Sequence, residues 1–364
     1  MIPVWDRFVR LFHWGLVAAV TLAGVTGFLL GPTWLVWHIF GGLVAAALIG
    51  ARIVWGFTGS THARFADFVT RPRATLAHLA ELRRGRAARH LGHNPLGGWM
   101  VLALIAAVLA LAASGTILLG GVFKTGPLKA LAYDTAHLIG ESHELFANLL
   151  LALIAAHLAG AAFESLRTRE NLPRAMLTGL KERRPGDHRP TLHSARPVLA
   201  IAATALLLGT IAAATLALMA RPGPTPATAP AAFAEECSAC HMAFPPALLP
   251  AASWQALMAG LDDHFGEDAS LDAAATAEIT AWLTAHAAET QDTKPAHLFR
   301  RANPDAPLAI TETRAWQRIH RDIAEATFAA KPVFTRSNCA ACHGDAASGA
   351  FFPPNVSIPK EALK

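Results

Sequence analysis

Charged residues and tyrosine are scarce in this chain of 364 residues. Only 16% of the residues are Asp, Glu, Lys or Arg, and there is a single tyrosine. Soluble domains carry about 25% charged residues, so the composition argues against an ordinary water-soluble protein. Hydrophobic residues instead make up 53% of the chain, which predicts several membrane spans and one further domain.

Several common signals of function are also missing. The sequence has no glycine-rich nucleotide loop, no flavin or nicotinamide fingerprint and no Ser/His/Asp set. It also lacks the alternating pattern that is typical of strands in a sheet. Nucleotide-dependent and hydrolytic chemistry therefore has no support in the sequence, and the chain is predicted to be mainly helical.

Five long apolar runs are each long enough to cross a bilayer, which takes about 20 residues. The first run begins with basic residues, as a signal peptide does, but no convincing small-residue cleavage site follows it. We therefore interpret it as a span. The five predicted spans are Phe12–Leu30, Trp34–Phe57, Leu96–Leu119, His137–Ala162 and Pro197–Ala220.

The distribution of basic residues predicts the orientation of these spans. The connections after the second and fourth spans are rich in arginine, whereas the loop between the third and fourth has only Lys124 and Lys129. The positive-inside rule then places the amino terminus in the cytoplasm and the carboxyl-terminal part outside. We interpret the arginines as solvated residues that set topology, not as a nucleic-acid site. From Arg221 onward the chain has 11 Lys and Arg against 16 Asp and Glu, so the external domain is acidic.

Histidines in the apolar runs are the first candidate functional residues. His143 and His157 stand 14 residues apart, which is about 21 Å along one face of a helix. Ionisable side chains in a membrane are costly and usually functional, and neutral imidazole is a common ligand of haem iron. In the predicted orientation, His13 and His157 lie near the cytoplasmic side of the membrane, and His38 and His143 lie near the outer side. We expect each pair to hold one low-spin haem b.

Other histidines are weaker candidates. His137 lies about 120° around the helix from His143, so we expect it to cap the helix or to face lipid headgroups. The histidines of the polar connections are expected to be solvated: His62, His78, His90, His93, His188 and His193.

The four cysteines form the most specific motif of the chain. They lie in two C-x-x-C-H stretches, Cys237-Ser-Ala-Cys240-His241 and Cys339-Ala-Ala-Cys342-His343. In this motif two thiols form thioethers to a haem and the histidine binds its iron. Because the two motifs use every cysteine, a zinc site or a disulfide is a less favoured alternative. Covalent haem attachment takes place outside the bacterial cytoplasm, which agrees with the orientation predicted from charge.

The sixth ligands of these two haems are left open by the motifs themselves. Only 21 residues follow His343, and none of them is histidine or methionine, so its partner must come from earlier in the chain. The candidates are His264, His286, His297, His320, Met242 and Met258. Residues 221–230 contain four prolines and are predicted to form a semi-rigid spacer before this domain.

The first 180 residues resemble the bacterial cytochrome b561 family, which is related to the cytochrome b subunits of nickel-iron hydrogenases and formate dehydrogenases. The resemblance rests on short stretches such as Arg10-Leu-Phe-His13-Trp14, Arg52-Ile-Val-Trp55-Gly56 and Gly92-His93-Asn94-Pro95. It implies haem ligands on the first, second and fourth helices, and quinone chemistry near one of the haems. Arginines suit anionic haem propionates or lipid headgroups, and the candidates are Arg10, Arg52 and Arg64.

Residues 231–364 resemble the dihaem cytochromes c. The similar stretches are Ala243-Phe-Pro-Pro-Ala-Leu-Leu-Pro250, Leu261-Asp-Asp-His264-Phe265-Gly266 and Arg318-Ile-His320. This resemblance implies two bis-histidine haems, with His264 serving the first motif and His320 the second. His286 and His297 are then expected to be surface residues.

Together these features predict an all-α protein of the bacterial inner membrane. Its predicted parts are a four-helix haem b bundle (1–180), a cytoplasmic connection with a fifth membrane helix (181–220), a linker (221–230) and a small helical periplasmic dihaem domain (231–364). The expected function is electron transfer from the membrane quinol pool, through two haems b and two haems c, to a soluble periplasmic cytochrome or haem protein. Two alternatives are a haem enzyme that reacts with superoxide or oxygen and passes electrons to quinone, and an electron-transfer anchor subunit of a larger redox complex.

Overall fold

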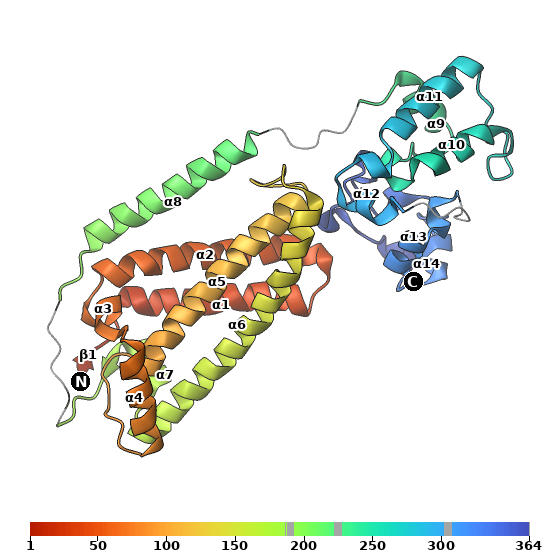
Figure 1. Cartoon of the computed structure of the whole chain (residues 1–364). Helices are drawn as coiled ribbons and strands as arrows, with labels where there is room; N and C mark the ends of the chain where they lie inside the picture. The colour runs from red at the N-terminus through yellow and green to blue at the C-terminus, as the bar shows by residue number, and fades with distance from the viewer. Residues whose placement is uncertain (186, 188–192, 222–227, 302–307, 364) are drawn as a thin grey trace. The chain divides into compact units, whose positions relative to one another are not determined.

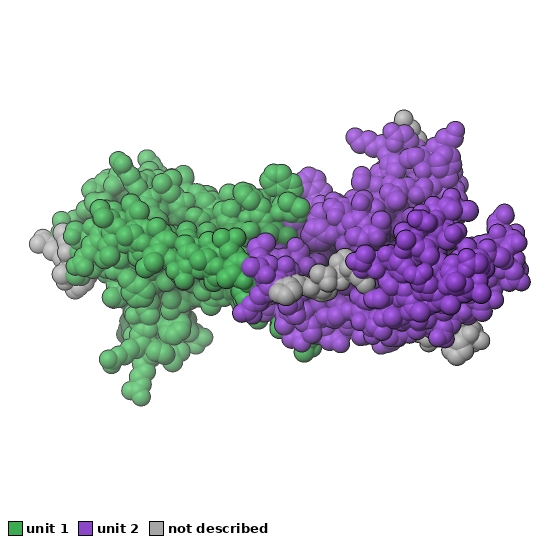
Figure 2. Space-filling view, turned by 90° about the horizontal axis from the view of Figure 1, so that it is seen from above, with its two compact units in different colours: residues 1–30, 36–116, 138–218 green, residues 31–35, 117–137, 219–364 purple. Residues whose placement is uncertain are grey.

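The computed structural model describes residues 1–185, 187, 193–221, 228–301 and 308–363. The chain divides into two compact units. Unit 1 comprises Met1–Leu30, Val36–Thr116 and Leu138–Leu218, and unit 2 comprises Gly31–Leu35, Ile117–His137 and Met219–Lys364 (Figure 2). Most of the predicted linker and His188 lie outside the described residues.

Five helices among the described residues are long and apolar enough to cross a membrane, which confirms the five predicted spans and a multi-pass membrane protein. They run through the first two-thirds of the chain (Figure 1). The fourth, with 36 residues, extends beyond its predicted apolar run at both ends. The five helices are α1 (Arg7–Phe28), α2 (Leu35–Thr58), α5 (Pro95–Gly121), α6 (Tyr133–Thr168) and α8 (Pro197–Met219).

The start of α1 is set by a capping carboxylate. Asp6 accepts a hydrogen bond of 2.8 Å from the Val9 amide, which satisfies one of the free N–H groups of the first turn. The same side chain accepts hydrogen bonds from Trp55 Nε1 at 2.9 Å and from Ser60 Oγ at 2.6 Å. Asp6 thus ties the beginning of α1 to the end of α2, as expected for two antiparallel helices joined by a short turn.

The interior of unit 1 is built from four helices that approach closely. Ala19, Ile49, Val108 and Leu150 share one buried cluster, so α1, α2, α5 and α6 all contribute to it. A Cβ added at Gly41 would lie only 3.0 Å from the Ala19 carbonyl oxygen. Small residues at such contacts let membrane helices pack tightly.

Short elements close one end of this bundle. Strands β1 (Ile2–Pro3) and β2 (Leu180–Lys181) pair antiparallel. Gly179, with a φ of +81°, ends the helix before β2, and a Cβ there would lie 2.5 Å from the Trp5 carbonyl oxygen. Glycine is therefore required at this turn. The remaining short elements of unit 1 are η2 (Thr61–Ala63), α3 (Phe65–Phe68), α4 (Pro72–Arg83) and α7 (Leu172–Thr178).

Helix α8 belongs to unit 1 as well. The Arg196 amide, just before α8, donates a hydrogen bond of 2.8 Å to the Thr58 carbonyl, and Ala200 shares a buried cluster with Trp55. Large apolar side chains such as Leu206 remain exposed on α8, as expected for a helix that faces lipid.

Unit 2 contains a small helical domain with its own apolar core. Trp254, Ile279, Leu283 and Phe328 are buried in one cluster, and Cys342 packs against it. The domain is predicted correctly as mainly helical. Its elements are α9 (Ala231–Cys237), η3 (Pro246–Leu248), α10 (Ala251–Ala259), η4 (Leu261–Asp263), α11 (Ala273–Ala285), η5 (Ala288–Thr290), α12 (Lys294–Phe299), η6 (Ile310–Glu312), α13 (Arg314–His320), α14 (Glu325–Ala329), η7 (Cys339–Ala341), η8 (Ala346–Ser348), η9 (Pro353–Asn355) and η10 (Lys360–Leu363), and η1 (Pro32–Trp34) also lies in unit 2.

Candidate haem-binding sites

Two histidines predicted to bind one haem b face each other inside unit 1. The ring centres of His38 on α2 and His143 on α6 are 6.1 Å apart, with an angle of 71° between the rings. A metal–imidazole bond of about 2 Å on each side, plus about 1 Å from nitrogen to ring centre, requires a separation of about 6 Å. The spacing therefore fits one iron between the two rings.

Hydrogen bonds to Nδ1 orient both rings. His38 Nδ1 lies 2.9 Å from the Ala23 carbonyl oxygen, which is only an acceptor. His143 Nδ1 lies 2.9 Å from Ser114 Oγ, and that hydroxyl already donates to the Ala110 carbonyl at 2.7 Å. Both Nδ1 atoms must therefore donate, which leaves both Nε2 atoms unprotonated. This is the tautomer that binds a metal through Nε2.

Glycines make room around the same two rings. A Cβ at Gly27 would lie 3.1 Å from His38 Cε1, and a Cβ at Gly115 would lie 3.2 Å from His143 Cε1. Both distances are tighter than ordinary contacts, so a side chain at either position would push an imidazole out of place. Neither glycine was singled out from the sequence.

The second predicted pair, His13 and His157, is supported by proximity but not by a ring contact. The two side chains are close enough to interact electrostatically. His13 Nδ1 is buried without a hydrogen-bond partner, so the pair lacks the orienting bonds that hold His38 and His143. The structure thus supports this pair less fully than the other.

The three predicted arginines differ in what their side chains do. Arg52 is 3% exposed, its guanidinium lies 5.3 Å from the Phe65 ring centre, and its Nη1 has no partner. Arg10 Nε is also buried and unpartnered, although its Nη1 donates to the Leu177 carbonyl at 2.7 Å. Buried cationic donors need an acceptor, and haem propionates fit that need. Arg64 instead donates to the Gly59 and Ser194 carbonyls at 2.8 and 3.0 Å.

The C-x-x-C-H motifs of unit 2 lie beside histidines at the same spacing. The ring centres of His241 and His264 are 6.2 Å apart, with an angle of 27° between the rings. Those of His320 and His343 are 6.1 Å apart, with an angle of 76°. Each motif histidine therefore has a partner that fits a second axial ligand, and each partner is the histidine expected from the sequence.

Backbone and aromatic groups support these two pairs. His241 Nδ1 donates to the Met242 carbonyl at 2.8 Å, and His320 Nδ1 donates to the Trp316 carbonyl at 2.9 Å, so both leave Nε2 free. Phe265 lies 4.9 Å from the His264 ring centre, and Phe351 lies 5.2 Å from that of His343. Burial lowers the pKa of His264, His320 and His343, which favours the neutral imidazole that a metal requires.

The alternative ligands occupy other environments. Met258 is buried in the apolar core. His286 Nδ1 donates to the Trp282 carbonyl of its own helix at 2.8 Å. His137 stacks on Tyr133 with ring centres 5.4 Å apart. The prediction of His297 as a surface residue is wrong, because its side chain is only 6% exposed and lies between two carboxylates.

Several histidines of the polar connections are not solvated as predicted. His78 is 8% exposed, and His62 Nδ1 lies within hydrogen-bond distance of Asp67 Oδ2, at 3.0 Å. The ring of His93 lies between those of Trp5 and Phe68, with centres 4.8 Å from each. Burial, with the positive charge of Arg52, lowers the pKa of His93 to about 3. For His93 the prediction failed because its ring is covered by residues distant in sequence, Trp5 and Phe68.

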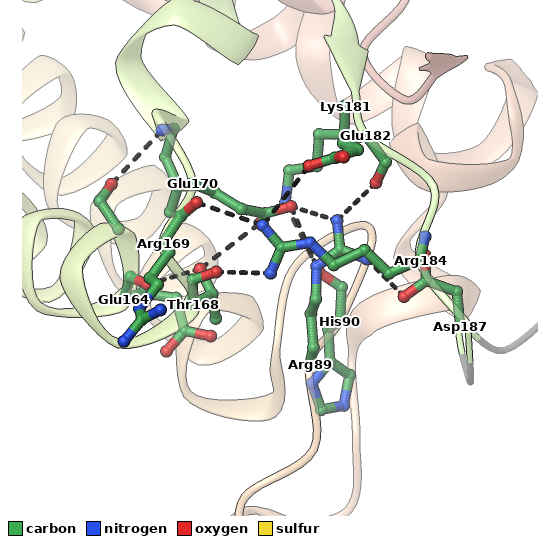
Figure 3. A network of polar contacts seen from close by, with 12 residues as sticks. Arg89, His90, Glu164, Thr168, Arg169, Glu170, Lys181, Glu182, Arg184 and Asp187 are labelled. Carbon is green, nitrogen blue, oxygen red and sulfur yellow. Dashed lines mark hydrogen bonds and ion pairs between the residues drawn. The ribbon is translucent and has the colours of Figure 1, made fainter.

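Arg89, interpreted from the sequence as a solvated residue that sets topology, instead lies in a polar network, with its side chain 13% exposed (Figure 3). Arg89 forms ion pairs with Glu170 and Asp187, and its Nη2 donates to the Glu182 carbonyl at 2.7 Å. Lys181 lies 3.5 Å from the same Glu170 carboxylate. The network joins the connection after α4 to the segment after α6, which the interpretation as a solvated face did not foresee.

Two family models match separate parts of the chain. Residues 4–179 match the family described as prokaryotic cytochrome b561, and residues 233–351 match the family described as dihaem cytochrome c. No curated protein matches the chain.

Solved structures of diheme cytochromes c each match about a third of this chain. The diheme cytochrome c from Rhodobacter sphaeroides is 43% identical, covering 34% of this chain and 98% of that chain, with a TM-score of 0.31. The diheme cytochrome type c from Shewanella baltica OS155 is 37% identical, covering 36% of this chain and 93% of that chain, with a TM-score of 0.30. From the two family matches and the five membrane helices, the chain is a fusion of a membrane-spanning prokaryotic cytochrome b561 domain with a dihaem cytochrome c domain, and it has a role in transmembrane electron transfer.

Proposed function

We propose that this chain takes electrons from a membrane quinol and delivers them to a soluble periplasmic cytochrome or haem protein. The observation that carries the proposal is the recurrence of histidine pairs whose ring centres are 6.1–6.2 Å apart, in both units of the chain. Haem iron, when bound, supplies the one-electron redox couple that amino-acid side chains lack. Repeated pairs of this kind suit electron transfer better than substrate turnover, because both axial positions are taken by protein.

In this proposal the four membrane histidines hold two haems b. His38 and His143 form one axial pair, and His13 and His157 form the other. Arg10 and Arg52 neutralise propionates beside the second pair, since both have buried donors without a partner. Arg64 has less support in that role, because its donors already bind backbone carbonyls.

In the dihaem domain the cysteines of each motif anchor a haem c covalently. His241 and His264 are the proposed ligands of the first haem, and His343 and His320 those of the second. The first pair lies beside Phe244 and Phe265, and the second beside Trp316 and Phe351. Trp316, which is buried, shields the second pair from water, whereas Phe265 is 62% exposed and leaves the first pair open to solvent. We place the domains at 1–180, with a fifth span to 220, and at 231–364 after a linker.

The orientation in the membrane follows from charge. Arginine-rich connections after α2 and α6 favour a cytoplasmic amino terminus and a periplasmic dihaem domain. The acidic balance of that domain favours a basic acceptor, and the attraction should weaken as ionic strength rises.

Proteoliposomes that contain the purified chain test this function. A short-chain quinol is added, and reduction of haem b and then haem c is followed by absorption, with a basic soluble cytochrome as the external probe. The variant His143→Leu should abolish reduction of haem c by quinol. Asn148→Leu is the matched control on the same helix, because it removes only a hydrogen bond to the Glu144 carbonyl. Unchanged haem c reduction in His143→Leu, or no haem reduction by quinol in the unmodified chain, would overturn the proposal.

A further inference from the structure

Unit 2 contains more than the dihaem domain. Besides residues from Met219 onward, it includes Gly31–Leu35 and Ile117–His137 (Figure 2). These two segments are the connections between α1 and α2 and between α5 and α6. Two turns from the membrane-spanning part of the sequence therefore pack together with the dihaem domain in one compact unit.

A single carboxylate of the dihaem domain is the centre of the polar contacts. Asp292 Oδ2 lies 2.6 Å from Lys124 Nζ, and both of its oxygens accept from the Tyr133 amide at 3.1 Å. His297 Nε2 lies 3.0 Å from Asp292 Oδ1. Burial alone would raise the pKa of Asp292, but hydrogen bonds from Lys124, His297 and Tyr133 lower it overall. The carboxylate therefore stays ionised and keeps its three partners.

A second set of contacts lies beside the first. Asp134, one residue along the connection, faces His297 Nδ1 at 3.3 Å and Arg300 at 3.5 Å. The His297 ring stacks on Tyr133, the only tyrosine of the chain, with ring centres 4.0 Å apart. Oppositely charged side chains and stacked rings therefore pair across the contact. Such pairs fix how the two surfaces align.

The apolar part of the contact leads to the second haem motif. Phe123 meets Phe352 with ring centres 5.7 Å apart, and Lys294 Nζ lies 5.2 Å from the Phe123 ring centre. The neighbouring residue Phe351 contacts the ring of His343. In addition, η1 packs against η9, which directly follows Phe352. Both connections therefore meet the segment that borders His343.

Each of the two connections runs directly into a helix that carries a proposed haem b ligand. Leu35 begins α2 three residues before His38, and His137 precedes His143 by six residues on α6. These separations are about 4.5 and 9 Å along a helix. No described hydrogen bond, ion pair or ring contact joins the first motif, Cys237–His241, to either connection.

We propose that Gly31–Leu35 and the contact residues of the second connection form a docking platform for the dihaem domain; those residues are Phe123, Lys124, Tyr133 and Asp134. The platform makes the Cys339–His343 motif the point of electron entry. The Cys237–His241 motif is then the point of exit to the soluble acceptor. This inference rests on the proposed electron-transfer function, and it adds the order in which the two c-type sites act.

Zero-length cross-linking tests the platform without reference to activity. Membranes that hold the full chain are treated with a carbodiimide, which activates a carboxylate for attack by a nearby amine. An isopeptide between Lys124 and Asp292 is expected by mass spectrometry, and its yield should fall at high ionic strength. Lys129 lies on the same connection and has no ion pair among the described residues, so no link from Lys129 to Asp292 is expected. Equal linking of both lysines would overturn the platform.

Charge reversal tests whether the platform controls electron entry. The variant Lys124→Glu places a carboxylate against Asp292 and should slow haem c reduction by haem b about tenfold. Lys124→Arg should keep most of the rate, and Lys129→Glu should match the unmodified chain. If haem b is never oxidised by haem c in the unmodified chain, the proposed function fails. If haem b does reduce haem c but the rate is the same in Lys124→Glu and Lys129→Glu, only the platform is contradicted.

Removing one haem c at a time tests the order. A chain with Cys237→Ala and Cys240→Ala should still reduce its remaining haem c from haem b, but should lose reduction of the soluble cytochrome. A chain with Cys339→Ala and Cys342→Ala should lose fast reduction of its remaining haem c. The reverse pattern would overturn the order. Where either double variant fails to fold, His320→Met keeps both covalent haems and changes the spectrum of one of them, and the haem c that is reduced first then decides the order.

Discussion

At the scale of single residues, the orienting partners of the histidines matter as much as the histidines themselves. Ser114 accepts from His143 Nδ1 while donating to the Ala110 carbonyl, so one hydroxyl fixes the tautomer of a proposed ligand. Such groups behind a ligand commonly contribute 10–100-fold to metal affinity.

The variant Ser114→Ala should therefore bind haem b about tenfold more weakly. Haem b content is measured after challenge with a haem scavenger. Thr116→Ala is the control, because the Thr116 hydroxyl only bonds the Ala112 carbonyl of the same helix. Equal haem retention in the two variants would show that Ser114 does not orient His143.

The low pKa of His93 leads us to expect that the stability of the folded chain depends on pH. Its pKa is about 3 in the folded chain because of burial and Arg52, whereas the ordinary value is about 6.5. The unfolded state binds the proton more tightly than the folded state does. The contribution of neutral His93 to the free energy of unfolding is therefore fully present above pH 6.5 and is lost as the pH falls toward 3.

His93→Phe should keep the ring between Trp5 and Phe68 but remove this titration. The thermal unfolding midpoint of the unmodified chain is expected to fall more steeply between pH 6.5 and 5 than that of the variant. Parallel curves would contradict the placement of a neutral His93 in that site.

At the scale of elements, close helix packing around the haem b pair gives the next prediction. Gly115→Leu would place a side chain against the His143 ring, because a Cβ there already comes within 3.2 Å of it. We expect loss of one haem b per chain by pyridine haemochrome assay. Gly209→Leu on α8 is the control, since nothing lies within 4 Å of a Cβ at that position. Full haem b content in Gly115→Leu would refute a tightly packed site.

The network around Arg89 joins the connection after α4 to the segment after α6. Arg89→Ala should lower the free energy of unfolding by about 1–3 kcal/mol, because Glu170 and Asp187 lose their charged partner. Arg86→Ala, an exposed change in the same connection, should have little effect. Thermal unfolding in detergent compares the two variants, and equal midpoints would exclude a stabilising role for the network.

The sequence predicts elements better than it predicts such contacts. The five spans follow from apolar length alone, and His38 and His143 follow from depth and periodicity. The partners of Arg89 lie 81 and 98 residues away, and the orienting groups of His38 and His320 are backbone carbonyls. Backbone carbonyls have no sequence signature, and distant ion pairs have no spacing rule, so neither set was predicted.

At the scale of the whole molecule, the fusion places a membrane cytochrome b561 domain and a dihaem cytochrome c domain on one chain. Charge divides the chain into an arginine-rich membrane part and an acidic dihaem part, and the cysteines identify the second part unambiguously. The packing of Ile117–His137 against the dihaem domain could not be foreseen, because Lys124 and Asp292 are 168 residues apart and carry no shared motif.

A pyridine haemochrome assay on the purified chain, with redox spectra, counts the haems that the four histidine pairs would hold. We expect two haems b and two haems c per chain, all low-spin, and the loss of one haem b in His38→Leu or His143→Leu. One haem b per chain would leave His13 and His157 without a haem, and the account of electron transfer across the whole bilayer would be contradicted.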